Sequence, residues 1–185
     1  MSNDLQQFIW PTSFACTIVT ENIILPNSYV INVNVEPTTT ANGNITLGFK
    51  KLRYFVESYL QNAVLIAKDN PLLPALENVE SNLVILPSDP YDYYLGCVLF
   101  SKFLAMTESY FDIGLITIDS MVGEHIQYCI TDPAESGLDL TGDHWWNMDT
   151  LDTGLGSNLT WNDLNINERP KFEPRIIKGG LSENQ

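Results

Sequence analysis

The residues best suited to acid–base or metal chemistry in this sequence are its two histidines. His125 follows Glu124 and comes six residues after Asp119. One imidazole and two carboxylates can bind a divalent metal or take part in general acid–base catalysis. A histidine on a strand can equally point to solvent or be satisfied by a neighbouring group. We favour this second, structural interpretation.

The second histidine lies in a stretch rich in carboxylates. His144 follows Asp143 and precedes two tryptophans, and three more acids occur nearby, at Asp139, Asp149 and Asp152. Loops of this composition can hold Ca²⁺. The spacing does not follow the calcium-loop pattern and lacks its closing glutamate. No metal site is therefore expected here.

Nucleophilic catalysis finds little support. Cys129 and His125 are four residues apart, which on a strand places them on one face but roughly 13 Å apart, too far for direct proton transfer. The sequence contains no GxSxG, HExxH, GxxxxGKS or GxGxxG motif. These observations favour a protein that is not an enzyme and has no cofactor. A metal-dependent hydrolase using His125, His144 and nearby carboxylates is kept as an alternative.

Charge is the strongest compositional signal. Nine Lys and Arg stand against 23 Asp and Glu, a formal net charge of −14. Such a chain is repelled by phosphate backbones, so no direct nucleic-acid binding is expected. The only basic cluster before the C-terminal end is Lys50, Lys51 and Arg53, which we consider a candidate partner-binding patch. No Lys or Arg occurs between Lys102 and Arg169.

Compartment and membrane signals are absent from the pattern. The first residues lack a basic region followed by an apolar one, so no secretory signal is expected. No apolar run approaches the roughly 20 residues of a membrane-spanning helix. Three cysteines at wide spacings, Cys16, Cys97 and Cys129, form neither a disulfide framework nor a metal motif, and we expect all three to be buried. An intracellular protein, cytoplasmic or within a viral assembly, and no membrane partner are predicted.

The first half of the chain predicts two strands and a helix. Residues 14–20 are rich in β-branched residues, and 28–36 alternate apolar and polar side chains with a period of two. Apolar residues recur at helical spacing over 46–62. Residues 63–67 fit either a helical extension or a short strand, and the sequence does not distinguish the two.

The second half predicts a further strand, a helix and a hairpin. Residues 83–87 form a compact apolar strand. The segment Ser88-Asp89-Pro90 supplies a helix-start signal for a largely apolar helix that ends near Thr107. Residues 111–119 and 124–130 read as two strands around a turn. Local hairpins mixed with isolated strands predict an α+β fold: a mostly antiparallel sheet with two helices packed on one face.

Composition changes at residue 132. We therefore divide the chain into a compact α+β domain, 1–131, and an extended, irregular, acidic segment with a basic end, 132–185. Three tryptophans lie in that segment: Trp145, Trp146 and Trp161. Indole rings in an irregular segment act as anchors that bury apolar area, either on the same chain or on a neighbouring one.

The pattern as a whole favours a non-enzymatic interaction or assembly protein. In this hypothesis the 132–185 arm docks through its tryptophans on a protein partner or on a second copy, for example as a subunit of a viral particle. An acidic protein that mimics nucleic acid and blocks a basic partner is the next alternative.

Overall fold

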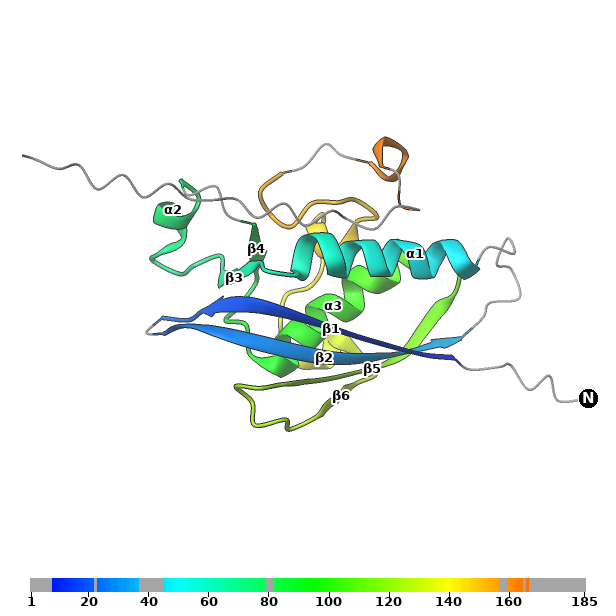
Figure 1. The fold of residues 1–185 in the computed structure, drawn as a ribbon, viewed down its shortest axis with the longest axis horizontal. Helices are drawn as coiled ribbons and strands as arrows, with labels where there is room; N and C mark the ends of the chain where they lie inside the picture. Colours follow the sequence, from blue (N-terminus) through cyan, green and yellow to red (C-terminus); the bar gives the residue numbers. More distant parts are fainter. Residues whose placement is uncertain are drawn as a thin grey trace, which may run out of the picture.

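The fold is that of a six-stranded sheet packed against two main helices (Figure 1). It comes from a computed structural model, which describes residues 8–21, 23–36, 45–78, 82–156, 160–164 and 166. The strands are β1 (Phe8–Val19), β2 (Ile24–Glu36), β3 (Val64–Ala67), β4 (Leu83–Leu86), β5 (Asp112–Ser120) and β6 (Tyr128–Ile130). The helices are α1 (Ile45–Phe55), a π-helix that continues it (Val56–Leu60), α2 (Leu73–Leu76) and α3 (Asp92–Thr107). Three short 3₁₀ turns follow, at Pro133–Ser136, Trp145–Asn147 and Trp161–Asp163.

The sheet is mixed, so the prediction of a mostly antiparallel sheet was wrong. Its strand order is β4-β3-β1-β2-β5-β6. The β1–β2, β2–β5 and β5–β6 pairs are antiparallel, whereas β3 runs parallel to β1 and β4 runs parallel to β3. α1 begins after β2 and runs along the sheet in the direction of β1, and β3 continues in that direction beside the end of β1. The 68–82 connection returns the chain between β3 and its neighbour β4, and a crossover of this kind makes two neighbouring strands parallel, whereas a tight turn makes them antiparallel.

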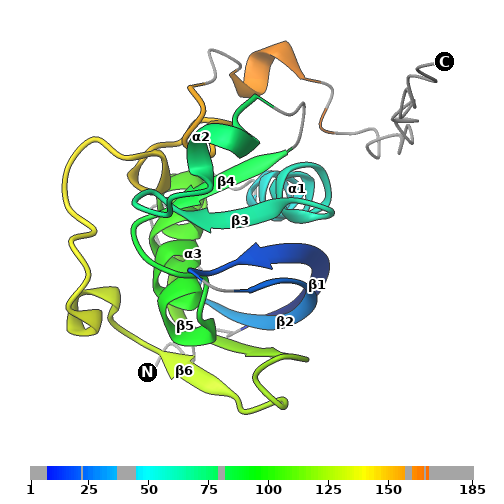
Figure 2. The same cartoon turned by 90° about the vertical axis from the view of Figure 1, so that its left-hand side faces the viewer.

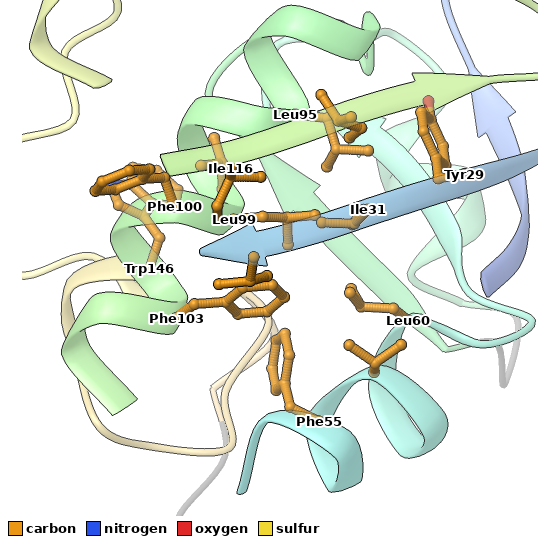
Figure 3. Packing of buried hydrophobic residues seen from close by; sticks show 14 of the residues in the cluster. Tyr29, Ile31, Phe55, Leu60, Leu95, Leu99, Phe100, Phe103, Ile116 and Trp146 are labelled. Atoms are coloured by element: carbon orange, nitrogen blue, oxygen red, sulfur yellow. The ribbon is translucent and has the colours of Figure 1, made fainter. Parts of the chain in front are cut away.

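Both main helices contact the same strand and each other. The Trp10 ring on β1 lies 6.5 Å from Phe49 of α1 and 6.3 Å from Phe103 of α3, between ring centroids. Phe55 of α1 lies 6.4 Å from Phe103 in an edge-to-face arrangement. Figure 3 shows the core between them, where Ile31 of β2 points toward α3. The α+β class is confirmed.

The structure also tests several predictions about single elements and residues. Residues 64–67 form a strand, one of the two options left open, and the helix predicted over 46–62 is present as α1 with its π-helical continuation. The predicted return strand 124–130 shortens to β6, because Glu124 and His125 have φ of 54° and 58° and so belong to the turn. Cys16 and Cys97 are buried, whereas Cys129 is exposed.

The chain beyond residue 132 is packed on the same core in its described part. Trp145, Trp146 and Leu151 are buried. Thr153 covers the outer edge of β4: its carbonyl accepts from Ile85 N (2.9 Å) and its hydroxyl donates to Leu83 O (2.8 Å). The edge strand is thereby protected from further pairing. Among the described helices, none combines the length and the apolar character needed to cross a bilayer.

Candidate functional site

The parallel strands bring three carboxylates to one end of the sheet. Glu21 follows β1, Asp69 follows β3 and Asp89 follows β4. Because the three strands run in the same direction, their carboxyl ends meet at the same sheet edge. A cavity of about 170 Å³ lies there, which we call the acidic pocket; it is lined by Glu21, Asp69, Asn70, Pro87, Ser88 and Asp89.

Negative charge in the acidic pocket is not balanced by its own walls. No Lys or Arg lines it, and in the described part of the chain no ion pair joins Lys68, the nearest lysine in sequence, to these carboxylates. Burial raises the pKa of Asp89, and the charges of Glu21 and Asp69 raise it further. A cation placed among the three carboxylates would reverse this repulsion.

The wall of the acidic pocket also contains a polar group with unused hydrogen-bonding capacity. Asn70 is 5% exposed. Its Oδ1 accepts a hydrogen bond from the Leu72 amide (2.9 Å), while its Nδ2 has no partner. A buried amide donor without an acceptor is costly, and native proteins contain few of them.

Turns with exposed apolar side chains lie at the same end of the molecule as the acidic pocket. The β1–β2 turn, the β5–β6 turn and the residue before α3 lie at the same end of the molecule, on the left of Figure 1 and facing the viewer in Figure 2. We define the turn-end surface as the acidic pocket together with six exposed side chains of these segments: Ile23, Ile24, Tyr91, Met121, Val122 and Ile126. Tyr91 and Ile126 are each 59% exposed. Clustered apolar exposure of this kind marks interaction sites.

Hydrogen bonds hold these segments to one another. The Asn27 side chain accepts from Val122 N (3.0 Å), which ties the end of the first hairpin to the second. Tyr29 donates its hydroxyl hydrogen bond to the Pro90 carbonyl (2.7 Å), which ties β2 to the start of α3. The exposed residues therefore project from a framework that is fixed by buried contacts.

A buried carboxylate fixes the β5–β6 turn on α3. Ser120 donates its hydroxyl to Asp92 (2.8 Å to Oδ1) and accepts a hydrogen bond from Gly123 N (3.0 Å). Burial raises the pKa of Asp92, whereas the bond from Ser120 lowers it. A side chain at position 123 would collide with the Asp92 carboxylate, so this approach requires glycine.

The two histidines take different places. His125 is exposed, and its Nδ1 lies 3.2 Å from Asp119 Oδ1. His144 stacks on Trp146 with ring centroids 4.6 Å apart. Within the described residues no three His, Cys, Asp or Glu side chains come close enough to hold a metal ion. The proposed metal-hydrolase set is therefore not brought together in the part of the chain that the structure describes.

The predicted tryptophan anchors lie on their own chain. Trp145 and Trp146 are buried, and Trp145 Nε1 donates to Ile85 O on β4 (2.8 Å). Trp161 is half-buried and donates to Asp149 Oδ1 (2.6 Å). Of the two alternatives for these rings, the structure shows packing on the same chain.

The predicted basic cluster is not an exposed patch. Lys51 is buried and pairs with Asp149, with 2.6 Å between Nζ and Oδ2. Its Nζ also lies over the rings of Tyr110 and Trp161. Lys50 and Arg53 are half-buried. The positive charge of Lys51 thus serves to hold the C-terminal segment on α1.

Sequence reasoning missed the role of a second buried lysine. Lys102 is 0% exposed, and its Nζ donates to three carbonyl oxygens, those of Trp145 (2.8 Å), Met148 (2.8 Å) and Thr150 (2.7 Å). Burial is the main cause that lowers its pKa to about 8. The signal was its position as the only cation of a helix that is otherwise largely apolar.

A second cavity lies at the other end of α3. It has a volume of about 590 Å³, an apolar floor from Phe100, Leu104 and Ala105, and carboxylates from Glu108, Asp112 and Asp132. We call it the acidic groove. None of the exposed apolar side chains of the turn-end surface lines it.

Comparisons with known proteins add no family. No family model matches the chain, and no curated protein matches it. Two solved structures are similar at a distance. A Wolinella succinogenes protein described as uncharacterized has 11% identity and a TM-score of 0.45, covering 69% of this chain and 98% of its own. A catalytic-residue mutant of Plasmodium vivax 6-pyruvoyltetrahydropterin synthase has 9% identity, the same TM-score and the same coverage. Similarity at this level does not establish a shared function.

Proposed function

We propose that this chain is a protein-binding module that recognises a basic partner at the turn-end surface. The observation that carries the proposal is that exposed apolar side chains belong to turns at the same end of the molecule as a pocket whose three carboxylates have no ion-pair partner among the described residues. Apolar side chains supply the area that is buried on association, and complementary charge supplies orientation and on-rate.

Charge supports a basic partner over a second copy of the chain. The formal net charge is −14, so two copies repel each other over long distances. A basic protein is attracted by the same field. This proposal keeps the interaction function expected from the sequence and moves the docking surface from the arm to the turn end, because Trp145 and Trp146 are already buried within the chain.

Paired variants test the proposal. Tyr91→Ser and Ile126→Ser remove two of the most exposed apolar side chains, and Leu155→Ser serves as the control because Leu155 is 51% exposed but lies outside the turn-end surface. The full chain and its variants are immobilised and exposed to an extract of the cells that express it. We expect proteins that bind the wild type and the control, but not the double variant, to be basic.

Salt dependence separates the two contributions. Retention of those proteins should fall as salt rises from 0.05 M to about 0.5 M, since charge attraction between exposed groups is screened. Equal retention by the double variant and the wild type, or retained proteins that are acidic, would contradict the proposal.

A further inference from the structure

We propose that the acidic pocket binds the guanidinium group of an arginine presented by the partner. This inference rests on the proposed function and specifies the chemistry at the centre of the same surface. The molecule has other features of this kind: the acidic groove, the exposed Cys129 and the buried Lys102. None of these combines converging carboxylates with an unused buried donor, as the acidic pocket does.

The carboxylates approach from three separate segments. Glu21, Asp69 and Asp89 follow three neighbouring parallel strands, so the sheet fixes their relative positions. Burial raises the pKa of Asp89, and the charges of Glu21 and Asp69 raise it further. The acids therefore repel one another in the free protein, and a bound cation would relieve that repulsion.

An organic cation fits the lining better than a bare metal ion. In the described residues no three acidic, histidine or cysteine side chains are close enough to ligate a metal. A planar guanidinium has five N–H donors and can bridge carboxylates that are farther apart than metal ligands. It is also less strongly hydrated than an ammonium group, so it loses less on entering a pocket.

Asn70 supplies the second observation. Its side chain is buried in the pocket wall with Nδ2 unpartnered, so it offers a donor that none of the described residues satisfies. An arginine in a peptide also carries carbonyl oxygens, which accept hydrogen bonds. The volume of about 170 Å³ suits a single side chain of this size and excludes a folded segment.

The test uses a blocked arginine and its neutral isostere. N-acetyl-arginine N-methylamide is titrated into the full-length, ¹⁵N- and ¹³C-labelled protein at low salt, beside the corresponding citrulline and lysine compounds. We expect the arginine compound to shift the amide signals of Asn70 and Ser88, with citrulline at least tenfold weaker because it lacks the charge. We also expect the carboxyl pKa of Asp89 to fall on binding.

Variants locate the binding. Asp89→Asn and Glu21→Gln each remove one carboxylate without removing a side-chain hydrogen bond that the structure shows, and each should weaken arginine binding about tenfold. Asp112→Asn, in the acidic groove, removes the same charge elsewhere and should change binding less than twofold. Equal losses from Asp89→Asn and Asp112→Asn would overturn the inference, as would citrulline binding as tightly as arginine or lysine binding more tightly.

The inference and the proposed function fail separately. Partner capture that depends on Tyr91 and Ile126 but survives Asp89→Asn refutes the arginine site and leaves the docking surface intact. Specific arginine binding with no captured protein lost in the double variant refutes the docking surface and leaves the pocket as a cation site.

Discussion

Replacement of Lys102 by methionine tests how the C-terminal segment is held on the core. Methionine has nearly the same length and no donor, so it fills the space but leaves the carbonyls of Trp145, Met148 and Thr150 without the amine. Each buried acceptor that loses its donor costs about 1 kcal/mol or more. We therefore expect Lys102→Met to lower the free energy of unfolding by about 3 kcal/mol at pH 7.

The pKa of Lys102 makes this loss depend on pH. Its pKa is about 8 in the folded chain and 10.5 in the reference state. The folded chain releases the proton first, so the unfolded state binds more protons above pH 8 and stability rises with pH. Between pH 7 and pH 9 these two pKa values raise the free energy of unfolding of the wild type by about 1 kcal/mol. Lys102→Met lacks the titrating amine and therefore lacks this increase. The difference between the two proteins should widen from about 3 to about 4 kcal/mol.

Urea unfolding followed by tryptophan fluorescence measures the difference at both pH values. A thiol also contributes to the pH dependence of each curve, because burial raises the pKa of Cys16 to about 12 and stability falls once the unfolded thiol ionises near pH 9. That contribution is common to both proteins and cancels in the difference. Lys68→Met, at an exposed lysine, should stay within about 0.5 kcal/mol of the wild type. A difference that does not change with pH, or a Lys102→Met protein as stable as the wild type, would refute the reasoning.

Two further substitutions test the packing of α3 and the Ser120–Asp92 hydrogen bond that holds the β5–β6 turn on α3. Gly96→Ala should cost about 1–3 kcal/mol, because its Cβ would lie 2.6 Å from Ile130 Cδ1 and 2.8 Å from Ile118 Cγ2; thermal unfolding beside Ser101→Ala, half-buried on the same helix, checks this. Ser120→Ala should cost about 1.5–3 kcal/mol at pH 7, because Asp92 loses its donor. Since the pKa of Asp92 is already raised and would rise further, the cost should be smaller at pH 4 than at pH 7, and an equal cost at both would be evidence against this role.

Local patterns predicted much of the secondary structure but not the direction of the added strands. Alternation over 28–36, helical spacing over 46–62 and the helix-start signal at Ser88-Asp89-Pro90 depend on neighbouring residues alone, and the corresponding elements are present. Whether β3 pairs parallel to β1 depends on where α1 returns the chain, which no local window contains. The error had a consequence for the site. An antiparallel sheet places successive strand ends on opposite sides, so it scatters Glu21, Asp69 and Asp89 rather than gathering them.

The tryptophans show the same limit in another form. Their residue type predicted burial, and the rings of Trp145 and Trp146 are buried. The two hydrogen-bond partners of Trp145 were not predictable. Its indole donates to the Ile85 carbonyl and its own carbonyl accepts from Lys102, and both residues are more than 40 positions away in sequence. Cys129 was expected to be buried as an apolar strand residue. On β6 it is Ile130 that is buried, and its neighbour Cys129 is exposed.

The two ends of α3 make different kinds of contact, and this difference explains how one end of a small fold can expose so many apolar side chains. Toward its C-terminal half, Lys102 and the Trp145–Thr150 segment complete the core and are fully buried or hydrogen-bonded. At its start, Asp92 and Pro90 hold the turns through polar contacts, which fix the backbone without requiring the outer side chains to be buried. The exposed residues can therefore vary in type at little cost to folding, whereas Asp92, Ser120 and Gly123 cannot. Buried hydrogen bonds fix the backbone of this surface, while its exposed side chains tolerate substitution. This arrangement is expected of a binding site on loops.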